Sequence, residues 1–250
     1  MGETVIVTDG NGVRVIRMNR PEKKNALTLE MYGTMARALS EANANASTRC
    51  VMIAGAPGIF TAGNDITDFM NAAMGGGGGA RPAVEFLEAL VRNQKPIVAA
   101  VGGMAVGIGT TMLFHCDYVV MASDAVLSTP FLKLGLIPEA ASTLLAPLQL
   151  GYARAFALLA VGRTLSAAEA KEAGVVGTVV PAAEVDATAL AAAREIAMLP
   201  PNALAVTRRL MRGNIEDIAE RIAAEGSHFS DLLKSDQARA AFAAFLGRKK

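Results

Sequence analysis

Two N-terminal segments, ETVIVTDG and VRVIRMNR, are rich in β-branched residues and flank an Asp-Gly-Asn-Gly sequence at 9–12. This pattern predicts a β-hairpin. Thr28 then suits the N-cap of a helix, and apolar residues recur at helical spacing from there to about Ala44. The first part of the chain is therefore expected to form a hairpin followed by an amphipathic helix.

Short apolar runs alternate with helical patterns in the middle of the chain. Past Gly135 the pattern becomes mostly helical. Such an order indicates an α/β core, which we place at 1–195, with a helical region at 196–250. A run of five glycines at 75–79 predicts a flexible loop. The expected strands are Cys50–Ala54, Pro96–Val101, Asp117–Met121 and Ala125–Ser128, and the expected helices follow Asp65 and span 82–93, 108–114, 139–149, 151–160, 166–173, 182–198, 202–213 and 215–246.

Composition narrows the class of protein. An apolar fraction of 52% is ample for a substantial core, and 24 Lys and Arg nearly balance 23 Asp and Glu. This balance gives no broad basic field for nucleic acid or an anionic membrane, so neither partner is expected. The uncharged stretch at 96–116 is long enough for a membrane span, but its initial proline and its glycines favour a strand, a turn and a buried helix.

The cysteines and histidines predict no disulfide and no metal site. Cys50 and Cys116 both sit in apolar runs, where buried free thiols are expected, and these fit a reducing cytosol. The N-terminus lacks the pattern of a signal peptide, so a cytoplasmic location is expected. His115 and His228 have no second ligand type at metal spacing, which argues against both zinc and a serine–histidine–carboxylate triad.

Two glycine-bearing turns carry the candidate chemistry, Phe60–Asp65 and Gly102–Gly109. Each follows a predicted strand and opens a predicted helix, where backbone N–H groups are unpaired. Two such turns can direct two N–H donors at one oxygen, which is the arrangement of an oxyanion hole. The residues alone also allow the plainer interpretation that both segments are only turns.

The two turns, in this order and spacing, resemble those of the crotonase (enoyl-CoA hydratase/isomerase) superfamily. Further matches cover nearly the whole chain: Asn19-Arg20-Pro21, Asn25-Ala26-Leu27, Cys116-Asp117, Thr164–Ala167 and Ala173–Val176. The resemblance implies an α/β fold, a crotonase-like spiral of ββα units with a C-terminal helical trimerisation region. It also implies a homotrimer or a hexamer of two trimers. The substrate would be an acyl-CoA thioester, with no separate cofactor, and the oxyanion N–H groups would belong to Asn64 and Ile108.

Carboxylates distinguish the reactions within this superfamily. The hydratases use two glutamates, and the corresponding positions here hold Thr111 and Phe131, neither of which can act as a base. Instead Glu139 lies at the start of a predicted helix, in a segment similar to the Δ3,Δ2-enoyl-CoA isomerases, as are 63–69 and 199–204. The resemblance implies that Glu139 moves a proton from C2 to C4 of a 3-enoyl thioester. The rival carboxylates, Asp65 and Asp68, are interpreted as structural.

Residues that bind the coenzyme are less evident. The resemblance points to the backbone at Ala62, Asn64 and Ile66. Lys23 and Lys24 are candidates for the phosphates, with solvated lysines as the alternative, and Met70, Phe69 and Phe131 are candidates for the acyl pocket, with core packing as the alternative. Two other functions stay open: a hydratase or related reaction using Glu139 alone, and a non-catalytic acyl-CoA binding protein.

Overall fold

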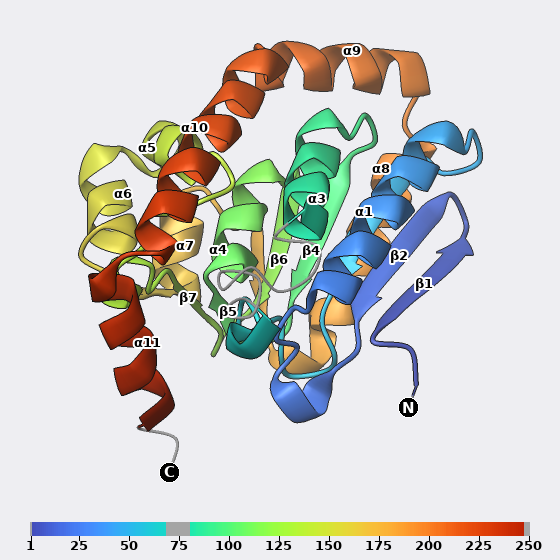
Figure 1. Cartoon of the computed structure of the whole chain (residues 1–250). Coiled ribbons are helices and arrows are strands. Elements are labelled where there is room, and N and C mark those ends of the chain that lie inside the picture. Colours follow the sequence, from blue (N-terminus) through green and yellow to red (C-terminus); the bar gives the residue numbers. More distant parts are fainter. Residues whose placement is uncertain (1, 69–80, 248–250) are drawn as a thin grey trace.

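A six-stranded sheet lies at the centre of residues 2–68 and 81–247, the part of the chain that the computed structural model describes (Figure 1). Its order is β1-β2-β3-β4-β6-β9, with the first pair antiparallel and every later pair parallel. Parallel neighbours joined through helices are expected of an α/β core. The strands are β1 Val5–Gly10, β2 Val13–Met18, β3 Cys50–Ala54, β4 Ile97–Val101, β6 Tyr118–Ala122 and β9 Thr178–Val180.

The predicted hairpin is confirmed. Val5 pairs with Met18 and Gly10 with Val13, and the chain reverses through Asn11 and Gly12. These two residues have φ angles of 51° and 78°, the left-handed conformation that asparagine and glycine adopt at low cost.

A smaller sheet of three strands stands beside the second glycine turn. It consists of β5 Ala105–Val106, β7 Val126–Ser128 and β8 Leu165–Ser166, with β5 parallel and β8 antiparallel to β7. Of these, only β7 is close to a predicted strand. β5 and β8 are two residues long, and such a length carries no alternation of apolar and polar positions for sequence reasoning to detect.

Helices cover the sheet and continue past it at the C-terminus (Figure 1). Thr28 caps the first of them, as predicted, by accepting a hydrogen bond from Met31 N at 3.2 Å. The helices are α1 Leu29–Ala44, α3 Arg81–Arg92, α4 Ile108–Thr111, α5 Ser142–Leu150, α6 Tyr152–Leu159, α7 Ala167–Glu172, α8 Val185–Met198, α9 Pro201–Arg212, α10 Ile215–Leu233 and α11 Asp236–Gly247. Short 3-10 turns occur at Pro21–Lys23, Met112–His115, Leu132–Leu134 and Ala182–Glu184.

One helix boundary differs from the prediction in a way that matters for function. A helix was expected from Glu139, but α5 begins at Ser142. Ala140 and Ala141 have φ angles of 62° and 52°, so they form a left-handed turn that cannot belong to a right-handed helix. Glu139 therefore lies on a turn that precedes the helix.

The core lies between the large sheet and its helices. All five residues of β3 and all five of β4 are buried, as expected for strands covered on both faces. Cys50 is a buried free thiol, as predicted, whereas Cys116 is free but partly exposed, which corrects the expectation of full burial. The uncharged stretch at 96–116 forms β4, β5, α4 and the 3-10 turn, and no helix in the described part of the chain is long and apolar enough to cross a membrane.

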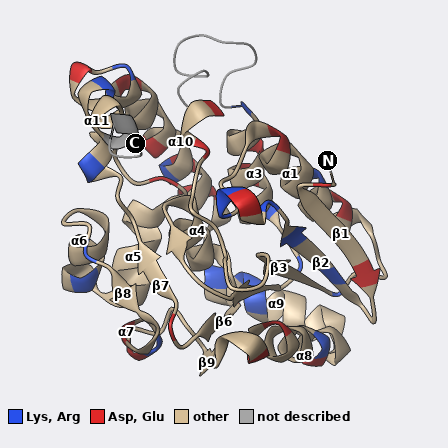
Figure 2. Cartoon of the chain, turned by 90° about the horizontal axis from the view of Figure 1, so that it is seen from below, with Lys and Arg blue, Asp and Glu red and all other residues tan. Residues whose placement is uncertain are grey.

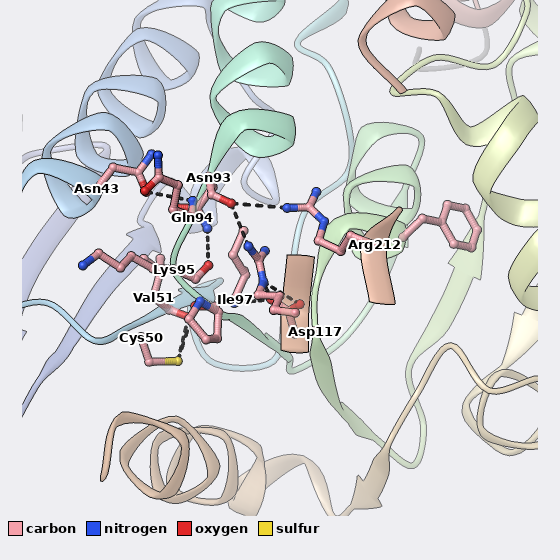
Figure 3. A network of polar contacts seen from close by, with 12 residues as sticks. Asn43, Cys50, Val51, Asn93, Gln94, Lys95, Ile97, Asp117 and Arg212 are labelled. Atoms are coloured by element: carbon pink, nitrogen blue, oxygen red, sulfur yellow. Dashed lines mark hydrogen bonds and ion pairs between the residues drawn. The ribbon is translucent and has the colours of Figure 1, made fainter. Parts of the chain in front are cut away.

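A buried polar network ties α9 to the end of the sheet (Figure 3). Arg208 is 8% exposed, and its Nε donates to both carboxylate oxygens of Asp117 at 2.8 and 2.9 Å. Asp117 also accepts from Ile97 N at 2.7 Å. The carbonyl of Asn93 receives hydrogen bonds from Arg208 at 2.7 Å and from Arg212 at 3.2 Å. This network fixes the start of the helical C-terminal region against β4 and β6.

Basic and acidic residues are intermixed on the helices at the rim of the molecule. Figure 2 shows both basic and acidic residues on α7, α8 and α11. The formal net charge of +1 agrees with this picture.

Candidate active site

The two glycine turns lie side by side. Thr61 forms an isolated parallel bridge with Ala105, with hydrogen bonds from Thr61 N to Met104 O at 3.1 Å and from Val106 N to Thr61 O at 3.0 Å. Gly63 has a φ of 88°, and a Cβ atom added to it would stand 2.9 Å from Val106 O. The close approach of the two turns therefore requires glycine at 63.

Each turn leaves one backbone N–H unpaired where the prediction placed it. Leu27 N donates to Gly63 O and Asp65 N donates to Leu27 O, both at 2.8 Å, and this pattern skips the N–H of Asn64. The N–H of Ile108 is the first of α4, where helix geometry supplies no acceptor. Within the described part of the chain, neither N–H donates a hydrogen bond.

A cavity of about 420 Å³ opens at these turns. Ala62, Asn64, Ile66 and Phe131 all line it, so the structure brings together four of the residues singled out from sequence. Its far wall comes from the C-terminal helices, through Phe229 of α10 and through Ala241, Phe242 and Ala244 of α11.

Two candidates for substrate binding fall elsewhere. Lys23 and Lys24 are exposed on the 3-10 turn and line neither this cavity nor the larger one described below. The contribution of Lys24 is through its backbone, since its carbonyl accepts from Ala62 N at 2.9 Å. Met70 lies outside the described residues, as does Phe69.

Glu139 lines a second cavity, of about 550 Å³, between α3 and α10. Its atom Oε1 is fully buried and has no hydrogen-bond partner among the described residues. Burial, and after it the negative charge of Glu225, raises the pKa of the Glu139 carboxyl to about 8. A carboxylate of this kind is a much stronger base than an exposed glutamate.

Phe229 lines both cavities. Tyr32 interacts with a residue of each cavity, with Asn64 of the smaller one and with Glu139 of the larger one. The hydroxyl of Tyr32, on α1, donates a hydrogen bond to Asn64 Oδ1. Burial raises the pKa of Tyr32 well above its ordinary value, and the charge of Glu139 adds to this effect. Glu139 thus lies within electrostatic reach of the group that holds Asn64. Tyr32 lies on the buried face of its helix, and the periodicity that predicts such a face carries no signal for the partner of its hydroxyl.

The positions of the two hydratase glutamates contain no acid. Thr111 is buried, and its hydroxyl donates to Gly107 O at a long 3.4 Å. Phe131 is 5% exposed, and its ring lies beside Gly107 at the wall of the smaller cavity.

The rival carboxylates have structural partners. Asp65 pairs with Arg20 at 2.7 Å and accepts from Thr67 N at 3.0 Å. Burial raises the pKa of Asp65, but these bonds outweigh it and the net pKa is lowered. Asp68 accepts from Leu29 N at 3.4 Å, at the start of α1. Neither carboxylate lines either of the two cavities.

Known proteins are similar to this chain over most of its length. The family model described as "Enoyl-CoA hydratase/isomerase" matches residues 8–250. The chain is 36% identical over 214 residues to enoyl-CoA delta isomerase 2 of Rattus norvegicus, covering 84% of the chain and 54% of that protein. It is 29% identical over 252 residues to a probable enoyl-CoA hydratase of Rhizobium meliloti, covering 99% of the chain and 96% of that protein.

A solved structure agrees with the fold. The crystal structure of an enoyl-CoA hydratase/isomerase from Pseudoalteromonas atlantica T6c aligns with a TM-score of 0.93 at 39% identity, covering 98% of both chains. The chain spans only about half the length of the rat relative, 54%. The similar proteins carry the names of isomerases and of hydratases alike, so their names do not distinguish the two reactions.

Proposed function

The chain belongs to the enoyl-CoA hydratase/isomerase family, and from that premise we propose that it is a Δ3,Δ2-enoyl-CoA isomerase. It would convert a 3-enoyl-CoA to the 2-trans-enoyl-CoA. The observation that carries the proposal is the carboxylate of Glu139, which lines a cavity and has a buried oxygen without a partner among the described residues, while Thr111 and Phe131 occupy the positions of the hydratase acids.

The reaction requires one base that gives back the proton it takes. Glu139 removes a proton from C2, and the electrons of that C–H bond delocalise through the thioester carbonyl and the C3–C4 double bond as a dienolate. The same proton then returns to C4, which leaves the double bond between C2 and C3. No water is added, so no second carboxylate is needed to activate one.

The oxyanion of the dienolate would lie between the N–H groups of Asn64 and Ile108. Neither donates a hydrogen bond to another described residue, and both belong to backbone fixed by the neighbouring turn. Donors of this kind typically contribute a few kcal/mol each to the stabilisation of a transition state, because they need no reorganisation as charge develops.

The placement of the two cavities supports a path for the substrate. The thioester would occupy the smaller cavity at the glycine turns, and the acyl chain would pass Phe229 into the larger one. The larger cavity is mostly apolar, with Leu87, Val91, Ile222 and Leu233 in its wall. Ala62 and Ile66 stand where the coenzyme would approach, while the exposed Lys23 and Lys24 remain candidates for its phosphates.

Two substrates and one variant test the proposal. Wild-type protein and Glu139→Gln are each incubated with a 3-enoyl-CoA and, separately, with a 2-enoyl-CoA, and products are separated by chromatography. We expect conversion of the first substrate by the wild type and its loss in Glu139→Gln, with acyl-CoA binding retained. Product from the 2-enoyl-CoA alone would favour hydration, and tight binding without turnover of either would favour a non-catalytic binding protein.

The family resemblance also leads us to propose a homotrimer or a dimer of trimers, and the buried free thiol of Cys50 fits the cytoplasmic location that we propose for it. Apolar side chains on the outside of two regions support an assembly. Leu210 and Met211 of α9 are 73% and 82% exposed, and Leu148 and Tyr152 of α5 and α6 are 75% and 73% exposed. Sedimentation velocity would measure the mass, and a monomer at micromolar concentration would contradict the assembly.

A further inference from the structure

The turn that carries Glu139 has an unfavourable backbone conformation. Ala140 and Ala141 follow it directly, with φ angles of 62° and 52°. A left-handed conformation costs a residue with a side chain roughly 1–2 kcal/mol, and two in succession persist only where neighbours hold them. The contacts of this turn therefore determine where the carboxylate of Glu139 stands.

Glu225 of α10 supplies the strongest of these contacts. It is 3% exposed, and its Oε2 accepts from Ala141 N at 2.7 Å. Its Oε1 accepts from Thr143 N at 3.0 Å and from the Thr143 hydroxyl at 2.6 Å. One buried carboxylate thus accepts three hydrogen bonds from the segment that follows Glu139.

These bonds replace a cap that the local sequence lacks. Ala141 is the N-cap residue of α5, and no side chain of that segment caps the helix. A carboxylate at a helix N-terminus satisfies unpaired N–H groups and is stabilised by the helix dipole. Here it comes from α10, and so the position of the turn depends on that helix.

On the other side, His115 holds the turn through Ala140. Its Nε2 lies 2.7 Å from Ala140 O, and because a carbonyl only accepts, the hydrogen resides on Nε2. Burial lowers the pKa of His115 to about 4, so the ring is neutral near neutral pH and brings no charge to the site. Of the two residues that hold the turn, Glu225 and His115, only Glu225 therefore brings a formal charge.

From these contacts we infer that Glu225 is a positioning residue for Glu139, holding the turn that carries the base and placing a negative charge behind it. The inference rests on the proposed function of Glu139. The charge of Glu225 disfavours a second negative charge on Glu139, so it makes Glu139 bind its proton more tightly and act as a stronger base once ionised.

Other charged groups near the two carboxylates must be considered for any pH dependence. Burial raises the pKa of Glu225, and its hydrogen bonds with Thr143 and Ala141 partly offset this increase. Arg221, on α10, donates to the Thr143 hydroxyl at 3.1 Å, and its charge also lowers the pKa of Glu225. After burial, the charge of Glu139 also raises the pKa of Tyr32 on α1. The larger cavity is also bordered by Arg81, Glu88 and Arg92 of α3 and by Lys234.

The variant Glu225→Gln tests the inference. The amide keeps the shape of the side chain but replaces one acceptor oxygen with an NH2 donor. One backbone N–H of the turn then loses its acceptor and faces another donor. We expect kcat on a 3-enoyl-CoA to fall about 10- to 100-fold, since small displacements of a catalytic group have effects of this size, with KM changed less than about twofold. The pH at which Glu139 ionises should fall as well. Glu220→Gln is the matched control, because Glu220 is exposed on the same helix, and it should match the wild type.

The ionisation of Glu139 provides a readout that does not depend on activity. It is measured by carboxyl-carbon NMR, assigned with Glu139→Gln, in the wild type and in Glu225→Gln. An active wild type together with an unchanged kcat and an unchanged midpoint in Glu225→Gln would overturn the inference. If the wild type does not convert 3-enoyl-CoA, the proposed function fails, and the midpoint alone decides on Glu225.

A second variant, Thr143→Val, tests the inference even if Glu225→Gln does not fold. Thr143→Val removes the 2.6 Å bond from the hydroxyl and leaves the carboxylate of Glu225 in place. We expect a smaller fall in kcat than for Glu225→Gln, with little change in the midpoint of Glu139. A Thr143→Val protein that lowers the midpoint as far as Glu225→Gln would contradict a role for the charge of Glu225.

Discussion

The hydroxyl of Tyr32 donates a hydrogen bond to Oδ1 of Asn64, the residue whose backbone N–H forms one side of the proposed oxyanion hole. The two residues come from separate parts of the fold, Tyr32 from the buried face of α1 and Asn64 from the first glycine turn. The bond holds the side chain of Asn64, and with it limits the freedom of the peptide that precedes it.

We therefore expect Tyr32→Phe to weaken catalysis without unfolding the protein. The ring of Tyr32 packs against Phe86 with centroids 5.4 Å apart, and phenylalanine keeps this contact. Loss of one hydrogen bond of about 0.5–1.5 kcal/mol should lower kcat/KM by roughly 2- to 13-fold. The control is Tyr118→Phe, which removes a hydroxyl 2.7 Å from Thr178 Oγ1, away from the site. Equal kcat/KM in both variants would argue against the role of Tyr32.

Gly63→Ala should separate the two turns. The new Cβ would stand 2.9 Å from Val106 O, and backbone there can yield only by moving the second turn. Removal of an oxyanion donor typically costs about 10²- to 10³-fold in kcat, and we expect a loss of that order. Steady-state kinetics with a 3-enoyl-CoA would measure it.

The matched control for this variant is Gly174→Ala. Gly174 has a φ of 86°, against 88° for Gly63, but an added Cβ would meet nothing within 4 Å. It should therefore show the conformational cost of the left-handed region, about 1–2 kcal/mol of stability, with normal activity. If both variants lose activity equally, the strain of a positive φ and not the spacing of the turns is responsible.

The sequence predicted those features of the site that one short segment contains, and it failed for those whose partner lies far along the chain. The glycine turns could be identified because each is a short contiguous segment, Phe60–Asp65 and Gly102–Gly109, whereas the role of their N–H groups as an oxyanion hole stays a prediction. The turn at Glu139 was predicted wrongly as helix. Of its left-handed alanines, Ala141 is held by Glu225, 84 residues further along the chain, and Ala140 by His115, 25 residues earlier, and no local pattern contains these partners.

The same reasoning explains what was missed. Tyr32 fits the periodicity of a buried helix face, and periodicity carries no information on where a hydroxyl finds its acceptor. Phe229 falls in a segment for which the sequence predicted only a helix, 215–246, yet it lines both cavities. Contributions from α10 depend on how that helix packs on α3 and α5, which is a tertiary property.

The ionisation of Glu139 should make both activity and stability depend on pH. With a pKa of about 8, its ionised fraction rises about tenfold per pH unit up to that value, so kcat/KM should rise with pH and level off above about 8.

The pKa of Glu139 in the folded state lies above the ordinary 4.5, so between these two values the folded state holds a proton that the unfolded state has lost. Wild-type stability should therefore fall between about pH 4.5 and 8 relative to Glu139→Gln, which cannot ionise.

Chemical denaturation at pH 4 and at pH 8.5 would measure this difference. Each unit of pKa corresponds to about 1.4 kcal/mol, and since Glu139 is partly exposed we expect Glu139→Gln to be more stable by roughly 1–3 kcal/mol at the higher pH. At pH 4 the two proteins should differ much less. A difference independent of pH would mean that Glu139 keeps an ordinary pKa.

Gly226→Phe should shorten the range of acyl chains that the protein accepts. Gly226 lines the larger cavity from α10, and nothing lies within 4 Å of a Cβ added there, so a side chain can be introduced without a clash at Cβ, and we expect a phenylalanine ring to fill part of the cavity. Each methylene excluded from an apolar site costs about 0.8 kcal/mol, roughly a factor of four in kcat/KM. Long-chain 3-enoyl-CoA substrates should lose most, and short ones should be unaffected.

Ala224→Phe is the control for that variant, because Ala224 is exposed on the same helix and does not line the cavity. Kinetics over a series of chain lengths would compare the two. A uniform loss across all lengths in Gly226→Phe would contradict the placement of the acyl chain between α3 and α10.

The network around Arg208 should determine how firmly α9 is attached. Replacing Arg208 with methionine leaves Asp117 without its cation and Asn93 O with only the 3.2 Å bond from Arg212. Breaking a well-buried pair costs about 3–5 kcal/mol, and because the side chain of Asp117 is 25% exposed we expect less, about 2–3 kcal/mol. For a chain of this size each kcal/mol lowers Tm by roughly 2–4 °C, which calorimetry resolves. Arg209→Met, at the exposed neighbouring position, should leave Tm unchanged, and an equal fall in both variants would mean that loss of charge on α9, and not the buried network, accounts for the effect.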